Sequence, residues 1–160
     1  MSQWTHVIGT IQCDKEDKFV VKALGKPVLW SDSDELEYGT PEYEDYDENV
    51  WKKAFEENRK GRGIPMGSEG SINYKITSTL EENDYAGEGT LVAIEGDLRD
   101  YGGEKDVDFI IDWFTRGARE LHARAAVLSI DDEWSDQFVV VYWDFGRVRV
   151  NYFPKEIENV

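Results

Sequence analysis

The sequence predicts an α+β domain with a ferredoxin-like, split β-α-β fold. In this prediction an antiparallel sheet carries two helices on one face and gains a β-hairpin at its C-terminal end. Apolar residues alternate with period two in several short blocks, which is typical of strands, and recur at helical spacing in two others. The blocks follow one another in the order β-α-β-β-α-β, and two further strands complete the chain. A length of 160 residues fits a single domain over residues 1–160.

The first element is a β-branched run at residues 4–12, which predicts a strand. Both faces of this run are partly apolar, which favours a central place in the sheet. Residues 18–30 hold two apolar pieces separated by Gly25 and Pro27, and they are compatible with either a short strand pair or an extended loop.

An acidic segment comes next, with nine acidic residues and neither lysine nor arginine between Asp32 and Glu48. Glycine and proline interrupt it, and no helical or strand period runs through it, so we predict a loop at about residues 31–48. A helix is predicted to begin with Asp47 as its N-cap and to end at the glycines that open a Gly-rich loop at residues 61–71.

The second half of the chain alternates clearly between strand and helix signals. A helix is predicted from Asp106 to Leu121, because apolar residues recur there at helical spacing. Strict alternation in the last strand predicts a place near the sheet edge. The predicted strands of this half lie at residues 71–77, 91–99, 125–130, 138–143 and 147–152.

Composition restricts the class of partner. Eighteen Lys and Arg residues against 34 Asp and Glu residues give a net charge of −16, which repels nucleic acids and anionic membranes. We therefore expect no direct nucleic-acid or membrane binding. The single cysteine, Cys13, excludes an internal disulfide and suits a reducing compartment. With neither a leader pattern nor a long apolar run, the sequence predicts a cytoplasmic protein.

No catalytic or metal-binding pattern stands out. His6, His122 and Cys13 lack the paired spacing of a zinc site. A calcium loop could begin at Asp32, but its sixth position is Glu37 instead of glycine. We predict no metal and no cofactor, and we favour a non-enzymatic protein.

The acidic segment is the main candidate site. Its charges form a phosphate-like array and its tyrosines supply contact area, so it suits a basic surface on a partner protein. Trp134, among acids between two strands, is either a lid on the core or an exposed anchor. The predicted partner-binding residues are Asp34, Glu35, Glu37, Tyr38, Glu42, Tyr43, Glu44, Asp45, Tyr46, Asp47 and Trp134.

This acidic, aromatic-rich composition resembles that of inhibitor proteins that mimic nucleic acid, often found in phages and mobile elements. The resemblance implies a basic protein partner, such as a nucleic-acid-processing or defence enzyme. It is one of composition and transfers no residue role.

Two alternatives remain open. The Gly-rich loop could bind a nucleotide or phosphorylated ligand, as a binding protein or an enzyme, through Arg59, Lys60, Arg62 and Ser68. The chain could also be a structural or assembly subunit that buries exposed tryptophans in a homo-oligomer.

Overall fold

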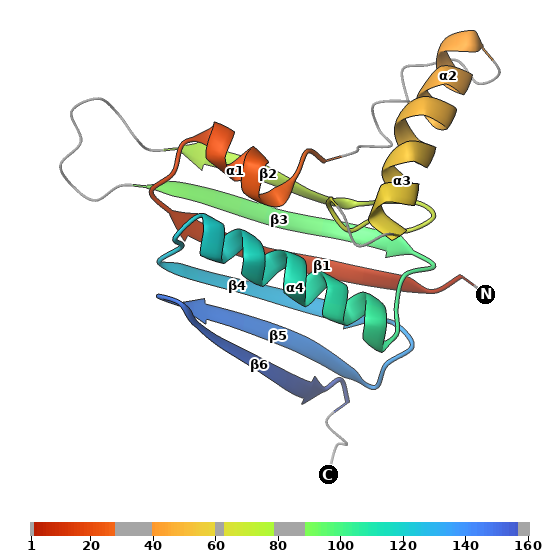
Figure 1. Ribbon diagram of the computed structural model, residues 1–160. Helices are drawn as coiled ribbons and strands as arrows, with labels where there is room; N and C mark the ends of the chain where they lie inside the picture. The colour runs from red at the N-terminus through yellow and green to blue at the C-terminus, as the bar shows by residue number, and fades with distance from the viewer. Residues whose placement is uncertain (1, 28–39, 60–62, 79–88, 157–160) are drawn as a thin grey trace.

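The computed structural model describes residues 2–27, 40–59, 63–78 and 89–156, and these form a six-stranded antiparallel sheet with helices (Figure 1). The strand order across the sheet is β2-β3-β1-β4-β5-β6. In chain order the strands are β1 (Trp4–Cys13), β2 (Ile72–Ser78), β3 (Thr90–Arg99), β4 (Ala125–Asp132), β5 (Gln137–Asp144) and β6 (Arg147–Pro154).

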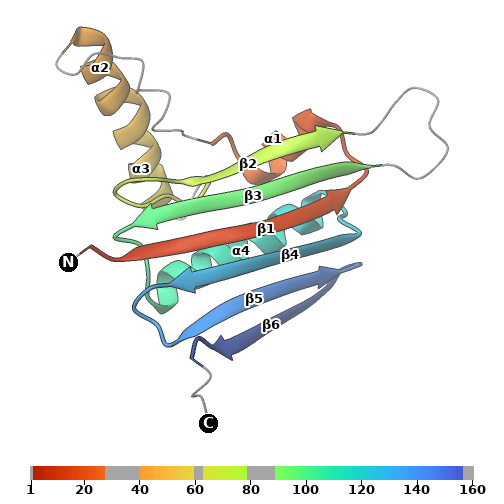
Figure 2. The ribbon, with the colours of Figure 1, turned by 180° about the vertical axis from the view of Figure 1, so that it is seen from behind.

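Two helices, α1 (Asp17–Leu24) and α4 (Glu104–Glu120), lie on one face of the sheet (Figure 1). Seen from behind, the opposite sheet face carries no helix of the described chain (Figure 2). Three consecutive segments, α2 (Pro41–Asp45), the π-helical η2 (Tyr46–Trp51) and α3 (Lys52–Arg59), form a projection that rises beyond the β2 side of the sheet. We call this projection, Pro41–Arg59, the arm.

The core lies between the sheet and the pair α1 and α4. On β1, alternate residues such as Val7 and Ile11 are buried, while Ile8 between them is exposed. Ile110 and Phe114 of α4 are fully buried against this layer, because they lie on the apolar side of an amphipathic helix. The alternation in the strands and the helical period in α4 therefore meet in one apolar layer.

Helices α1 and α4 are joined closely. The indole Nε1 of Trp113 donates a hydrogen bond to the carbonyl oxygen of Leu24 at 2.8 Å. A Cβ at Gly117 would lie 2.4 Å from the Leu24 side chain, so glycine lets the two helices approach.

The predicted fold class, a ferredoxin-like sheet with two helices on one face, is wrong. The structure is a six-stranded antiparallel sheet, and its helical segments exceed the two predicted. The helix predicted from Asp47 does not cover the sheet and belongs to the projecting arm (Figure 1). The helix that does pack beside α4 is α1, in a segment for which the sequence favoured strands or a loop.

Several single elements were predicted correctly. β1 pairs with β3 on one side and β4 on the other, which confirms its central place. β6 pairs with β5 and ends the sheet, as its alternation indicated. α4 begins two residues before the expected Asp106 and ends one residue before Leu121.

Candidate functional site

The arm contains part of the segment predicted to be an acidic loop, and that prediction is wrong for residues 41–48. Helix α2 begins at Pro41, and the Glu44 amide donates to the Thr40 carbonyl oxygen at 3.1 Å to close its first turn. Proline suits the first turn because its missing N–H has no partner there. Acidic Glu42 and Glu44 in the same turn favour the positive end of the helix dipole.

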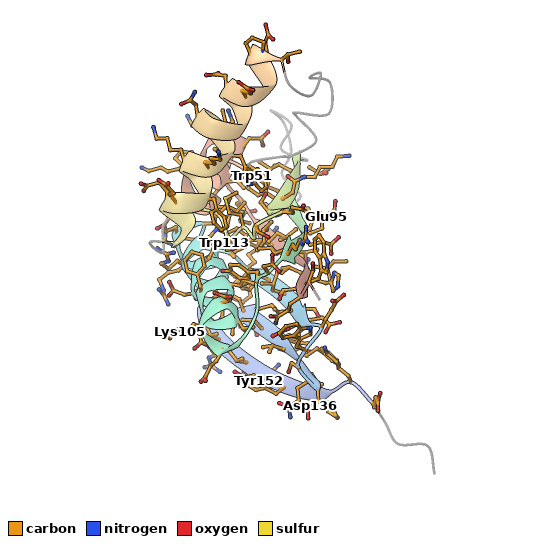
Figure 3. The ribbon with its side chains drawn as sticks, turned by 90° about the vertical axis from the view of Figure 1, so that its right-hand side faces the viewer. Trp51, Glu95, Lys105, Trp113, Asp136 and Tyr152 are labelled. Carbon is orange, nitrogen blue, oxygen red and sulfur yellow. The ribbon has the colours of Figure 1, made fainter. Side chains whose placement is uncertain are left out.

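The arm exposes acidic side chains and is attached at its base. Glu42, Glu44 and Asp45 are exposed, and the Asn49 amide donates to Asp45 Oδ1 at 2.5 Å. Trp51, on the arm, is buried at 5% exposure and is labelled in Figure 3. The arm thus presents its charges on a regular helical scaffold.

The other predicted partner-binding residues fall into two groups. Tyr43, Tyr46 and Asp47 lie on the arm, in α2 and η2. Four residues of the prediction lie outside the described residues, namely Asp34, Glu35, Glu37 and Tyr38. The structure therefore brings the second half of the predicted acidic site onto one helical element.

Trp134 is exposed and is not a lid on the core, because 65% of its surface is accessible, while its role as an anchor stays a prediction. It lies on the β4–β5 hairpin beside a cavity of about 610 Å³. Three features surround this cavity: the first turns of α4, the hairpin, and the end of β6. Its lining includes Glu104, Val107, Asp108, Ile130, Asp132, Trp134, Val139 and Tyr152.

Asp132 joins Gln3, the β4–β5 hairpin and the start of α4 at this cavity. Its Oδ1 accepts hydrogen bonds from Gln3 Nε2 at 2.6 Å and from the Trp134 amide at 3.1 Å. Its Oδ2 accepts from the Gly103 amide, just before α4, at 2.9 Å. Burial alone would raise the pKa of Asp132, but these N–H donors outweigh it and hold the pKa below its ordinary value. Asp132 is therefore a structural carboxylate.

The Gly-rich loop packs on the end of β3. The Ser68 amide donates to the Arg99 carbonyl oxygen at 2.9 Å, and the Ser68 hydroxyl donates to Asp100 Oδ2 at 2.8 Å. A Cβ at Gly67 would lie 2.2 Å from the Arg99 carbonyl oxygen, which explains glycine there. The polar groups of Ser68 are therefore engaged within the protein and face a carboxylate.

The other three residues predicted for anion binding are not brought to Ser68 by any described contact. Arg59 is the last residue of α3, while Lys60 and Arg62 lie outside the described residues. The anion-binding alternative stays a prediction.

His6 on the helix-free sheet face is a feature that the sequence analysis missed. Its Nδ1 lies 2.5 Å from Asp97 Oδ1, and its Nε2 lies 3.0 Å from Glu133 Oε1. Hydrogen bonds to these two carboxylates raise the pKa of His6 above its ordinary value. The register pairs His6 with Asp97 and with Asp131, so only knowledge of strand pairing could have found the cluster.

Among the described residues, neither a reactive thiol nor a metal cluster is found. Cys13 is fully buried, and burial raises the pKa of its thiol, which disfavours the reactive thiolate. Within the described ranges, histidine, cysteine and acidic residues form no group of three or more placed to hold a metal ion. In the same ranges, no helix has the length and apolar character needed to cross a membrane.

Comparison with known proteins gives one weak structural similarity. No protein-family model and no curated protein matches the chain. Among solved structures, the chain is similar to a phage SAM lyase in its apo state, at 12% sequence identity. The match covers 99% of this chain and 94% of that chain, with a TM-score of 0.34. A similarity at this level supports no functional argument.

Proposed function

We propose that this chain is a non-enzymatic acidic binding protein whose arm engages a basic, nucleic-acid-binding surface of a partner protein. The observation that carries the proposal is the arm itself. A segment rich in carboxylates projects from the sheet in helical form, and Trp51 within it is buried. Charges fixed on a scaffold lose less conformational entropy on binding than charges on a flexible loop.

The charge density of the arm is comparable with that of a nucleic acid. Residues 41–48 contain five acidic residues, and eight helical residues extend over about 12 Å. This gives about one negative charge per 2.4 Å of axis, against about one per 1.7 Å in duplex DNA. A groove that binds phosphates could therefore accept the arm through the same lysine and arginine residues.

The net charge of −16 adds a long-range contribution to the same interaction. A field of one sign accelerates association with a basic partner and makes the rate depend on salt. Binding through exposed charges should therefore be lost as salt rises, because ions screen them.

The test uses three full-length baits: the unchanged chain, an arm variant and a control variant. The arm variant carries Glu42→Gln, Glu44→Gln, Asp45→Asn and Asp47→Asn. The control variant removes four exposed charges elsewhere, through Glu16→Gln, Asp17→Asn, Glu120→Gln and Asp144→Asn. Both variants have the same net charge, −16 + 4 = −12, so any difference between them reports position and not total charge.

Each bait is incubated with native cell extract at low and high salt, and retained proteins are identified by mass spectrometry. We expect a basic nucleic-acid-binding protein to be retained at low salt by the unchanged and control baits and displaced by duplex DNA. Four charges at about 0.5 kcal/mol each predict about 30-fold weaker binding for the arm variant. Equal retention by the arm and control variants, or no displacement by DNA, would refute the proposal.

A further inference from the structure

The cavity beside Trp134 lies at the other end of the molecule from the arm and has its own chemistry. In Figure 3, Lys105, Asp136 and Tyr152 mark this lower end, while Trp51 lies on the arm above. A volume of about 610 Å³ is typical of small-ligand sites. Its floor is apolar, formed by Val107, Ile130 and Val139.

Two aromatic side chains line this cavity, and no described lysine or arginine lies over either ring. Trp134 and Tyr152 both line it and are 65% and 56% exposed. Some other rings of the described chain have a cation over them, as Tyr142 has Arg149 at 5.3 Å. Within the described residues, no lysine or arginine occupies the corresponding place over Trp134 or Tyr152.

The charge of the lining selects for a cation. Glu104 and Asp108 are exposed, line the cavity and stand at i and i+4 on one side of α4. Neither carboxylate has an ion-pair partner among the described residues, and the described lining contains no lysine, arginine or histidine. The positive end of the α4 dipole is worth about half a unit charge, so it does not offset two carboxylates. An anion is therefore disfavoured here.

We propose that this cavity binds a guanidinium group, with its plane against Trp134 and its N–H donors directed to Glu104 and Asp108. A planar guanidinium stacks on an aromatic face and can reach two carboxylates at once, which a compact ammonium does less well. The apolar floor suits the aliphatic stem of such a ligand. The group can belong to a free small molecule or to an arginine side chain of a partner.

The test titrates the full-length protein with N-acetylarginine methylamide and follows the tryptophan indole N–H signals by NMR. Trp134→Phe assigns the relevant signal. The neutral control is N-acetylcitrulline methylamide, which has nearly the same shape and carries no charge. We expect the Trp134 signal to shift with a dissociation constant of about millimolar size, and the citrulline compound to bind at least about tenfold more weakly.

Variants separate this site from general attraction to an acidic protein. Trp134→Ala and the pair Glu104→Gln with Asp108→Asn should each weaken binding at least about fivefold. Two matched controls lie elsewhere on the surface: Phe145→Ala removes another exposed aromatic ring, and Glu120→Gln removes an exposed charge at the far end of α4. Both controls should bind as the unchanged protein does. All these side chains are exposed, so the variants are expected to fold.

The source of the guanidinium is distinguished by comparing the blocked arginine with agmatine. Tighter binding of the blocked arginine assigns the cavity to a side chain of a partner, and tighter binding of agmatine assigns it to a free small molecule. Equal binding of the citrulline compound, or shifts confined to tryptophans other than Trp134, would overturn the proposal. The arm plays no part in this assay, so its outcome is independent of the proposed function.

Discussion

Replacing Asp132 with asparagine should loosen the end of the molecule that contains the cavity. The carboxylate is 7% exposed and accepts hydrogen bonds from Gln3, Gly103 and the Trp134 amide. In Asp132→Asn, the amide oxygen can keep the two donors at Oδ1, but its NH₂ group then meets the Gly103 N–H. One charge-assisted hydrogen bond is lost and a buried donor is left without a partner.

The expected loss follows from these contacts. A hydrogen bond to a charged group is worth about 1.5–3 kcal/mol, and an unsatisfied buried donor adds to the cost. We therefore expect the free energy of unfolding to fall by about 2–3 kcal/mol and Tm to fall by about 5–10 °C in a chain of this size. Asp136→Asn, an exposed residue of the same hairpin, should stay within about 0.5 kcal/mol.

The pH dependence of this difference provides a second check. Because the pKa of Asp132 is lowered on folding, its contribution is fully present above the unfolded value of about 3.9 and is lost as pH falls through the folded pKa. Urea unfolding of both proteins should show a large gap at pH 7 that narrows below about pH 4. A gap below about 0.5 kcal/mol at pH 7, or one that is constant down to pH 2.5, would refute this role of Asp132.

Three further substitutions test other parts of the structure. In urea unfolding, the stabilisation from the raised pKa of His6 should be present below about pH 6.5 and lost as pH rises through the folded pKa. Because the His6 side chain is partly exposed to solvent, this stabilisation should not exceed about 1 kcal/mol. His6→Gln should remove the pH dependence. Gly70→Ala should lower the free energy of unfolding by more than about 3 kcal/mol, because φ is +77° and a Cβ would lie 1.9 Å from a carbonyl oxygen. Gly63→Ala, at φ +74° in open space, should lower it by about 1 kcal/mol. Equal losses would contradict the steric reason. Gly117→Ala improves helix propensity by about 1 kcal/mol, but overpacking against Leu24 costs about 1–3 kcal/mol. We therefore expect a lower Tm in thermal unfolding. A higher Tm would show that Leu24 moves aside.

The strands could be predicted because their signal is local. The burial of β1, β3 and β4 follows a period of two, and the two-sided apolar character of β1 indicated a central strand. Helix α1 could not be read in the same way. Its segment is rich in β-branched and aromatic residues, and only Val20 and Leu24, four residues apart, are buried. The contact of α1 with α4 favours the helix, and this contact cannot be predicted from the local sequence.

The arm shows how one residue can be interpreted in two ways. Pro41 breaks a helix when it lies in the interior, but it is favourable in the first turn. With Pro41 taken as a helix breaker, the helix was expected to start at Asp47, whereas it begins at Pro41. The acidic residues that follow were therefore assigned to a loop, although their charge already favoured a helix N-terminus.

The candidate sites depend on contacts between distant parts of the chain. His6 is 91 residues from Asp97 and 127 from Glu133, and strand register alone brings them together. The cavity likewise combines the start of α4 with a hairpin and β6. Trp134 could be recognised from the sequence as a candidate anchor, but its two possible roles could be separated only by its exposure.

The position of the cavity follows from the width of the sheet. Six strands at about 4.8 Å spacing place the outer strand axes about 24 Å apart, whereas two helices of about 10 Å diameter cover about 20 Å. Helices α1 and α4 lie over the β2 to β4 part of the sheet and α4 also contacts β5, so the inner side of β6 extends past them (Figure 1). Tyr152 on β6 and Trp134 on the preceding hairpin therefore stay exposed beside the first turn of α4. The added C-terminal hairpin thus does more than widen the sheet, because it supplies one wall of a cavity whose other wall carries the carboxylates of α4.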